Sequence, residues 1–357
     1  VADAKFHPIT GNILAAVNGE IWEIDHNTGE TIRVFDKAEG AIGGLFTSFD
    51  GTKIIANGKY LYDYQSGRKE RTLKGRASAT TDYSYGYWFP DNIRLLGTTD
   101  SCYSISVPPW NTCDINLVIY DVGLDTIIAS YNPNDFFLPG SYVHLARMSL
   151  SPDGKYIAMV FKNKVESYWY PILVSVDSMK AVKDGYFWMN DNESIGLEPT
   201  DIKWSKDSKY VGLRYGNGKL SIFDVAEWIN SKWQSGKYSY LGFSVESFDF
   251  ASDRDNIVLE GSHNNRQGIR LVNLFSKDIR YYFPSYGYIK TGNNNNFIDY
   301  GGGGLSYWEY SPVNVKESYK LFSPIKSILY NRGTLIISIS TEEIIADITI
   351  FDINGKM

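Results

Sequence analysis

The sequence SPDGKYIAMVF, residues 151–161, joins a polar turn to an apolar segment. Its first six residues supply Ser, Pro, Asp and Gly, which are the residue types found in tight turns between antiparallel strands. The remaining five, IAMVF, form a short continuous apolar run after a turn, which is typical of a strand buried on both faces. The stretch therefore predicts a hairpin whose second strand enters a core.

Turns of this kind recur along the whole chain of 357 residues. Each lies between a short strand and an apolar strand and is rich in Gly, Asn, Asp, Ser or Pro. The eight turns are HPITGN (7–12), SFDGTK (48–53), FPDNIR (89–94), SPDGKY (151–156), SKDSKY (205–210), ASDRDN (251–256), GNNNNF (292–297) and YNRGTL (330–335).

A second recurring element follows each turn, namely a strand that ends in an acid or amide. The interval between successive ends ranges from 36 residues (Asn273 to Glu309) to 58 residues (Asp63 to Asp121). These intervals are close to the roughly 40–50 residues expected for one four-stranded blade of a β-propeller. The eight strand ends are Asp25, Asp63, Asp121, Asp177, Asp224, Asn273, Glu309 and Asp352.

Together these elements resemble the WD-repeat and related propeller families over essentially the whole chain. The resemblance is carried by the turn and strand of residues 151–161 and by aromatic–Asp pairs such as Tyr62-Asp63 and Phe223-Asp224. The chain departs from the family pattern because it lacks a Gly-His dipeptide before each unit and never places Trp directly before Asp. The resemblance implies a propeller that acts as a binding or scaffolding module.

We therefore predict one all-β domain, residues 1–357, that forms a β-propeller of eight four-stranded blades. Seven blades is the alternative, if the Asn- and Gly-rich unit at 284–322 is not a true blade. A β-sandwich is the other fold that suits short, regularly spaced strands. The predicted blades cover approximately residues 1–40, 41–80, 81–135, 136–185, 186–242, 243–284, 285–322 and 323–357.

The composition argues against several classes of partner. The net charge of -6, from 35 basic and 41 acidic residues, provides no basic surface for nucleic acid or anionic membranes. No apolar run approaches the roughly 20 residues that cross a bilayer. Two cysteines and four scattered histidines do not make a usual zinc site. We expect no metal, no cofactor, no nucleic acid and no membrane insertion.

Five connections are long, and in a propeller all five are expected on the same face: 74–84, 101–114, 132–144, 163–171 and 183–200. They are rich in aromatic residues, which dominate protein interfaces and sugar-binding platforms. The alternative is that the loops pack on one another and that YWYP (168–171) only extends a strand. The predicted partner-binding residues are Tyr83, Tyr85, Trp110, Phe136, Phe137, Tyr142, Tyr168, Trp169, Phe187 and Trp188.

A protein partner is the function that this face favours. The alternative is a carbohydrate-binding or surface-recognition propeller of an exported or virus-particle protein. A propeller hydrolase is the third class, because acids near the face could form a glycosidase pair. The chain lacks the motifs of a nucleophile elbow, a zinc protease or a phosphate loop, so we favour a non-enzymatic role. The acids are Asp82, Asp100, Asp114, Asp135, Glu166, Asp184, Asp191, Glu193, Glu198 and Asp201.

Two further local features carry predictions. Cys102 and Cys113 flank the segment YSISVPPWNT and are expected at facing ends of antiparallel strands, where a disulfide fits. A bridge predicts an exported protein or a particle surface, and free thiols predict the cytoplasm. Residues 226–236 place Trp228, Ile229 and Trp233 near helical spacing, which predicts a short helix that covers the edge of the fifth blade rather than a binding helix.

Overall fold

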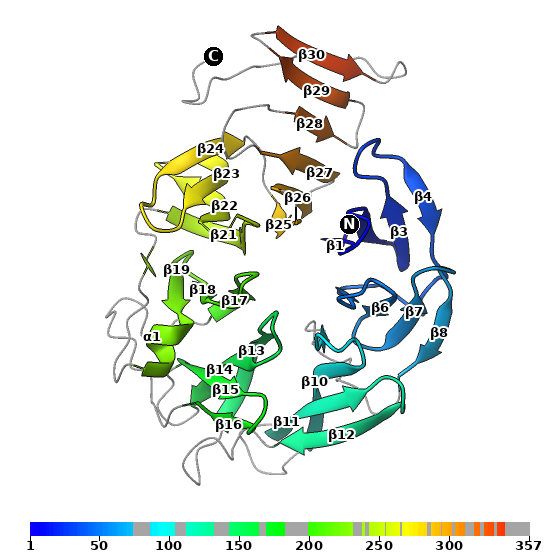
Figure 1. Ribbon diagram of the computed structural model, residues 1–357, viewed down its shortest axis with the longest axis vertical. Coiled ribbons are helices and arrows are strands. Elements are labelled where there is room, and N and C mark those ends of the chain that lie inside the picture. The colour runs from blue at the N-terminus through cyan, green and yellow to red at the C-terminus, as the bar shows by residue number, and fades with distance from the viewer. Residues whose placement is uncertain are drawn as a thin grey trace. The chain divides into compact units, whose positions relative to one another are not determined.

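The computed structural model describes most of the chain as antiparallel β-structure (Figure 1). The described residues form thirty strands and one helix, which are distributed over two compact units, residues 1–34 with 242–357 and residues 35–241. The structure describes residues 1–73, 86–103, 112–131, 143–163, 169–182, 199–230, 238–239, 243–253, 255–264, 266–283, 287–293, 295–301, 304–310, 318–321, 325–331 and 334–339.

The unit of residues 35–241 contains four sheets, each made of four strands that follow one another along the chain. We call them blades two to five. Blade two comprises β5 (Leu45–Thr47), β6 (Lys53–Ala56), β7 (Tyr60–Asp63) and β8 (Lys69–Thr72); blade three β9 (Tyr87–Trp88), β10 (Arg94–Tyr103), β11 (Thr112–Asp121) and β12 (Thr126–Tyr131); blade four β13 (Val143–Leu150), β14 (Tyr156–Asn163), β15 (Trp169–Ser175) and β16 (Lys180–Ala181); and blade five β17 (Pro199–Trp204), β18 (Tyr210–Tyr215), β19 (Leu220–Asp224) and β20 (Tyr238–Ser239).

The other unit contains three sheets, which we call blades one, six and seven. Blade seven has two additional strands at its edge. Blade one comprises β1 (Asp3–Phe6), β2 (Ile13–Val17), β3 (Glu20–Ile24) and β4 (Thr31–Val34); blade six β21 (Phe243–Phe250), β22 (Asn256–His263), β23 (Arg266–Asn273) and β24 (Ile279–Phe283); and blade seven β25 (Tyr288–Thr291), β26 (Asn296–Gly301), β27 (Gly304–Glu309), β28 (Ser318–Leu321), β29 (Ile325–Asn331) and β30 (Thr334–Ile339).

The fold is an all-β β-propeller with four-stranded antiparallel blades, as predicted from the repeats. The count of eight blades is wrong, because the described residues form seven sheets, which was the alternative. The turn at 330–335 does join two strands, but β29 pairs with the edge of β28 through Ser318↔Leu329 and Tyr319↔Ile328. The hairpin expected to begin an eighth sheet therefore extends the seventh, whereas residues 288–321 form β25 to β28 after all.

The apolar strands are buried on both faces, since alternate residues pack against different neighbouring blades. In β14, Ile157 and Met159 belong to the core shared with blade three. Ala158 and Val160, from the same strand, belong to the core shared with blade five. Period-two alternation sends successive side chains to opposite faces, so a strand with two apolar neighbours appears in the sequence as a continuous apolar run.

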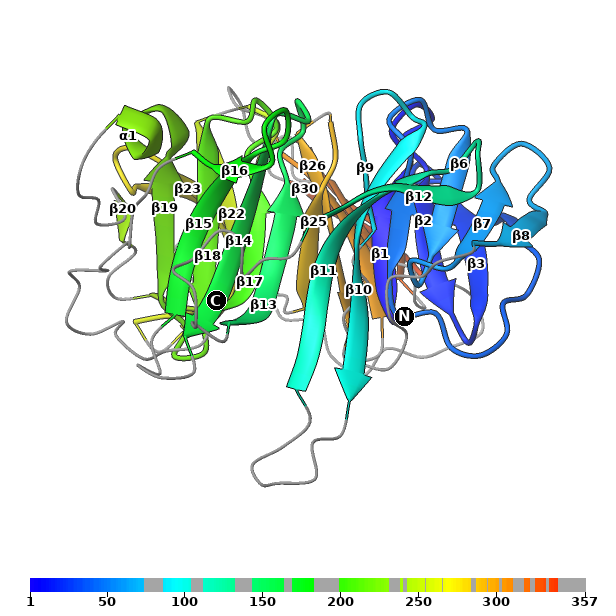
Figure 2. The ribbon, with the colours of Figure 1, turned by 90° about the horizontal axis from the view of Figure 1, so that it is seen from below.

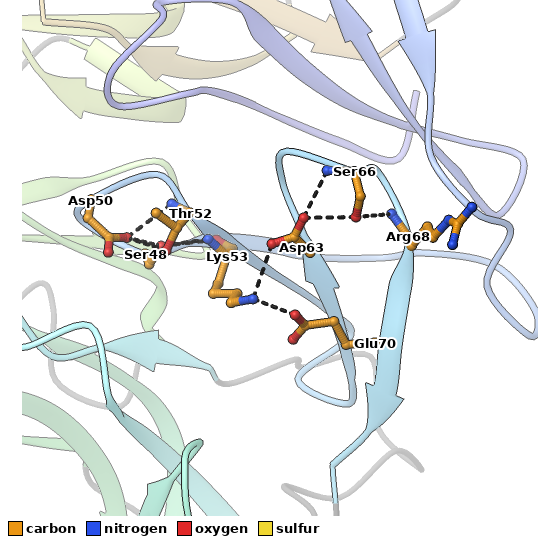
Figure 3. A network of polar contacts seen from close by, with 8 residues as sticks. All are labelled: Ser48, Asp50, Thr52, Lys53, Asp63, Ser66, Arg68 and Glu70. Carbon is orange, nitrogen blue, oxygen red and sulfur yellow. Dashed lines mark hydrogen bonds and ion pairs between the residues drawn. The ribbon is translucent and has the colours of Figure 1, made fainter.

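Three turns of sequence Ser-x-Asp repeat one pattern of hydrogen bonds, shown for the first of them in Figure 3. The serine hydroxyl donates to the aspartate at 2.6–2.8 Å and accepts a backbone N–H from five residues further on at 2.9 Å. The aspartate also accepts a backbone N–H two residues on. The pairs are Ser48–Asp50, Ser151–Asp153 and Ser205–Asp207.

The acids and amides that end the third strands hold the next turn in each blade. Asp25, Asp63 and Asp121 accept backbone N–H groups from two or three residues further along. Asn273 does the same for Ser276. Asp224 accepts the N–H of Glu227 at the start of α1 (Val225–Asn230). The repeated strand end predicted from the sequence is therefore a turn-capping position.

Neighbouring blades within each unit are also linked by hydrogen bonds. The indole N–H of Trp88 donates to the carbonyl of Phe46 in blade two, and that of Trp204 donates to the carbonyl of Ser149 in blade four. The turns are linked as well: Asp153 N–H donates to the Ser208 hydroxyl at 3.1 Å. These bonds fix the first strands of adjacent blades relative to one another inside a unit.

The predicted helix over 226–236 forms as α1, which ends at Asn230. Trp228 is only 3% exposed and packs against Phe223 with a ring separation of 5.1 Å. The helix thus covers blade five, as expected, and Trp233 lies outside the described residues. Among the helical residues that the structure describes, none belongs to a segment long and apolar enough to cross a bilayer.

We predict that Ser151→Ala lowers the free energy of unfolding by about 1–3 kcal/mol, because two backbone and side-chain partners lose a buried hydroxyl. Ser151 is 1% exposed and bonds both Asp153 and the N–H of Tyr156. Urea unfolding measures the change. The control is Ser130→Ala on an exposed position of β12, which should change stability by less than about 0.5 kcal/mol. Equal effects of the two variants would contradict the role of the turn.

We also predict a pH-dependent contribution from Asp63. The backbone N–H and the hydroxyl of Ser66 lower the pKa of its carboxyl, and Lys53 lowers it further. A lowered folded-state pKa stabilises the protein above the ordinary carboxyl pKa, and this contribution is lost as the pH falls through the folded-state value.

The measurement compares Asp63→Asn with the wild type by urea unfolding. The variant should be less stable near neutral pH, by about 1 kcal/mol or less, and the difference should shrink as the pH falls below about 4. Asp278→Asn, on an exposed position, is the control. A stability difference that is constant with pH would show that the charge of Asp63 is not involved.

Candidate functional site

The predicted aromatic face begins where strands of blades two to five end. In blade four, Val143 is the register partner of Asn163, and Trp169 is the partner of Lys162. The start of β13, the end of β14 and the start of β15 therefore lie at one end of the sheet. The connections that carry the predicted aromatics lead from such strand ends.

Most of the predicted binding residues lie outside the part of the chain that the structure describes. Trp169 is the exception, and it belongs to β15 rather than to a connection. The segment YWYP thus extends a strand from Trp169 onwards, which was the alternative interpretation. The residues outside the described ranges are Tyr83, Tyr85, Trp110, Phe136, Phe137, Tyr142, Tyr168, Phe187 and Trp188.

The connection predicted at 101–114 is shorter than expected, because β10 and β11 continue into it. The two strands form an unbroken ladder of ten pairs from Arg94↔Asp121 to Tyr103↔Thr112. Figure 2 shows this hairpin reaching past β13, β14 and β15 of the same unit. Within the ladder Cys102 is paired directly with Cys113, as predicted for facing strand ends. A disulfide between them is not shown and stays a prediction.

The described carboxylates act mainly as structural groups. Asp201, one of the acids considered for a hydrolase, lies 3.6 Å from the ammonium of Lys203 and accepts the N–H of Ile202. Asp100 and Asp114 belong to β10 and β11, and the other seven lie outside the described ranges. Within those ranges no group of three or more His, Cys, Asp or Glu residues is placed to hold a metal.

The network around Lys53 shows how such acids are used (Figure 3). Lys53 contacts Asp63 at 3.2 Å and also Glu70, so one ammonium joins β6, β7 and β8. Burial alone would lower the pKa of Lys53, but hydrogen bonds to Glu70 and Asp63 raise it. The network therefore stays charged at neutral pH and braces blade two rather than presenting a reactive group.

A pocket that the repeat analysis did not identify lies in the unit of residues 1–34 and 242–357. Its volume is about 260 Å³, and it is formed by the ends of β1 and β25 with the turns that follow them. Two lysines contribute, Lys5 and Lys290, from opposite ends of the chain. The only sequence signal is that both lie two residues before a recurring turn. The lining residues are Lys5, Phe6, Pro8, Lys290, Thr291, Gly292 and Asn293.

Comparison with known proteins identifies the fold. The chain is similar to the β-propeller domain of Cps50 (Swd1) from Myceliophteria thermophila, with a TM-score of 0.62, 11% sequence identity, and coverage of 87% of this chain and 96% of that chain. No family model and no curated protein matches the sequence. Because 1220 solved chains match, the fold is a common one and does not by itself specify a function.

Proposed function

We propose that this propeller is a non-catalytic interaction module that binds a protein partner through the connections of blades two to five. The observation that supports the proposal is the ten-pair ladder of β10 and β11, which carries the segment containing Trp110. A regular ladder of this length is a firm base for a recognition segment. The likeness to the Swd1 propeller domain supports the fold on which this presentation depends.

The physical basis of the proposal is presentation from a pre-organised scaffold. Blades two to five share continuous apolar cores, and their first strands are joined by the bonds of Trp88, Tyr87 and Trp204. The ends of the strands are therefore fixed before a partner arrives. Less conformational entropy is then lost on binding, so that a few aromatic anchors supply much of the affinity.

We predict that Trp110→Ala and Trp188→Ala each weaken partner capture by about tenfold or more, since truncation of a hot-spot residue costs roughly 2 kcal/mol or more. The tagged full chain is used as bait in a pull-down, and the affinity for each recovered partner is measured with the purified proteins. The thermal midpoint of the variants should match that of the wild type.

The control is Phe49→Ala, which removes a 42% exposed aromatic ring from the turn between β5 and β6. This turn lies at the opposite end of blade two from the connection that leaves β8. Partner recovery that is unchanged in both tryptophan variants would refute the proposed face. Binding to a glycan panel that is lost in the same variants would favour the carbohydrate-binding class instead.

The cysteine pair adds a prediction about the same hairpin. Register partners in an antiparallel ladder have Cα atoms about 4.5–5.5 Å apart, within the range that a disulfide spans. We predict that Cys102 and Cys113 form a disulfide in protein from an oxidising compartment or a particle surface. Closing so short a loop would contribute roughly 3 kcal/mol.

Alkylation without reductant, followed by mass analysis, tests the bridge. The expected result is no modified cysteine in native protein and two after reduction. Two alkylated thiols in the unreduced protein would exclude the disulfide and favour the cytoplasm. Cys102→Ser serves as the control, because it should leave one thiol that is modified with or without reductant.

A further inference from the structure

The pocket between β1 and β25 combines positive charge with apolar walls. Lys5 and Lys290 are both partly buried, and Phe6 and Pro8 line the pocket beside them. None of the seven described lining residues is acidic. A partly buried cation attracts an anion more strongly than a fully exposed one, because less water screens the charge. The lining therefore suits an anionic group that has an apolar part.

The two strands that form the pocket are held together by contacts from other residues. The Tyr300 hydroxyl of blade seven donates to the Asp3 carboxylate of β1 at 2.8 Å. Ala4 of β1 lies in one apolar cluster with Ile298 and Tyr300 of blade seven. Lys5 and Lys290 thus project from strands whose relative position is fixed inside one unit.

The floor of the pocket is backbone, because no side chain fits at Gly292. A Cβ atom there would meet the Asn296 side-chain oxygen at 1.9 Å and Phe6 at 3.1 Å. The neighbouring Thr291 is fixed by its N–H to Asp249 at 2.9 Å and by its hydroxyl to the carbonyl of Phe250 at 2.7 Å. The cavity is therefore part of the folded turn rather than a gap between mobile side chains.

The same repeat position elsewhere shows what is particular to this pair. Lys203 of blade five also lies two residues before a turn, but its ammonium is 3.6 Å from Asp201 on its own strand. In blade six the position is Asp249, whose carboxylate accepts the N–H of Thr291. The pocket between blades one and seven is lined by two lysines from two different strands, which is an arrangement that an ion pair on one strand does not produce.

We propose that this pocket binds a small anion, either a phosphate or a carboxylate group. The volume of about 260 Å³ lies below the roughly 300–1,000 Å³ of sites for drug-sized ligands. Lys5 and Lys290 supply charge-assisted hydrogen bonds to the anion. Asn293 supplies an amide, and Phe6 with Pro8 contacts whatever apolar group the anion carries.

The test is a titration of the ¹⁵N-labelled full chain with inorganic phosphate, acetate or benzoate. Sodium chloride at matched ionic strength is the reference. The expected result is a saturable change of the amide signals of Lys5, Phe6, Thr291, Gly292 and Asn293 with at least one probe and none with chloride. Saturation by phosphate alone assigns a phosphate ligand, and tighter binding of benzoate than of acetate assigns a carboxylate with an apolar body.

Lys5→Gln and Lys290→Gln should each weaken binding of that probe by about tenfold, since each removes a charge-assisted hydrogen bond. Lys155→Gln, on an exposed turn of blade four, is the control and should bind as the wild type does. Asn293→Asp keeps an exposed residue of similar shape and should also weaken binding, so the test does not depend on the lysine variants alone.

No saturable change with any probe up to about 10 mM would overturn the proposal. Wild-type affinity in both lysine variants would overturn it as well. The pocket is independent of the aromatic connections, so Trp110→Ala should keep full anion binding. Failure of the partner experiment and failure of the anion experiment are therefore distinguishable.

Discussion

The fold depends on one constraint, namely that each blade is apolar on both of its faces. Blade four contributes Ile157 and Met159 to the core on one side and Ala158 and Val160 to the core on the other. Blade seven does the same with Phe297 and Ile298. Such a sheet cannot be stable in water by itself, so every blade requires neighbours. The hydrogen bonds between turns and first strands then fix the orientation that the apolar contacts leave open.

Local chemistry made much of this fold predictable from the sequence. A serine and an aspartate two residues apart are sufficient to build the turn at Ser151, and an acid at a strand end is sufficient to cap the turn at Asp63. The blade count was less accessible. The turn at 330–335 has the same composition as the others, yet its strands join β28, because the free edge of an existing sheet decides where a hairpin pairs.

The candidate sites were predictable to different degrees. The pairing of Cys102 with Cys113 followed from strand register, which is a local property, and the structure shows that register. Trp169 was expected in a loop, but period-two strand structure extends to it. The pocket at Lys5 and Lys290 was not predicted, because the two residues are brought together only by the packing of blade one on blade seven. Proximity of this kind arises from tertiary structure.

The hairpin of β29 and β30 has a consequence for association between molecules. By pairing with β28 it satisfies the backbone groups of an outer edge, and among the described strands of that sheet β30 becomes the new edge. The covered strand, SYKL, contains a lysine that discourages pairing with another chain, whereas TLIISI, the sequence of β30, contains no charge. Uncharged, β-branched edges are templates for strand addition. The extension therefore moves the position most open to intermolecular β-pairing from a guarded strand to an unguarded one.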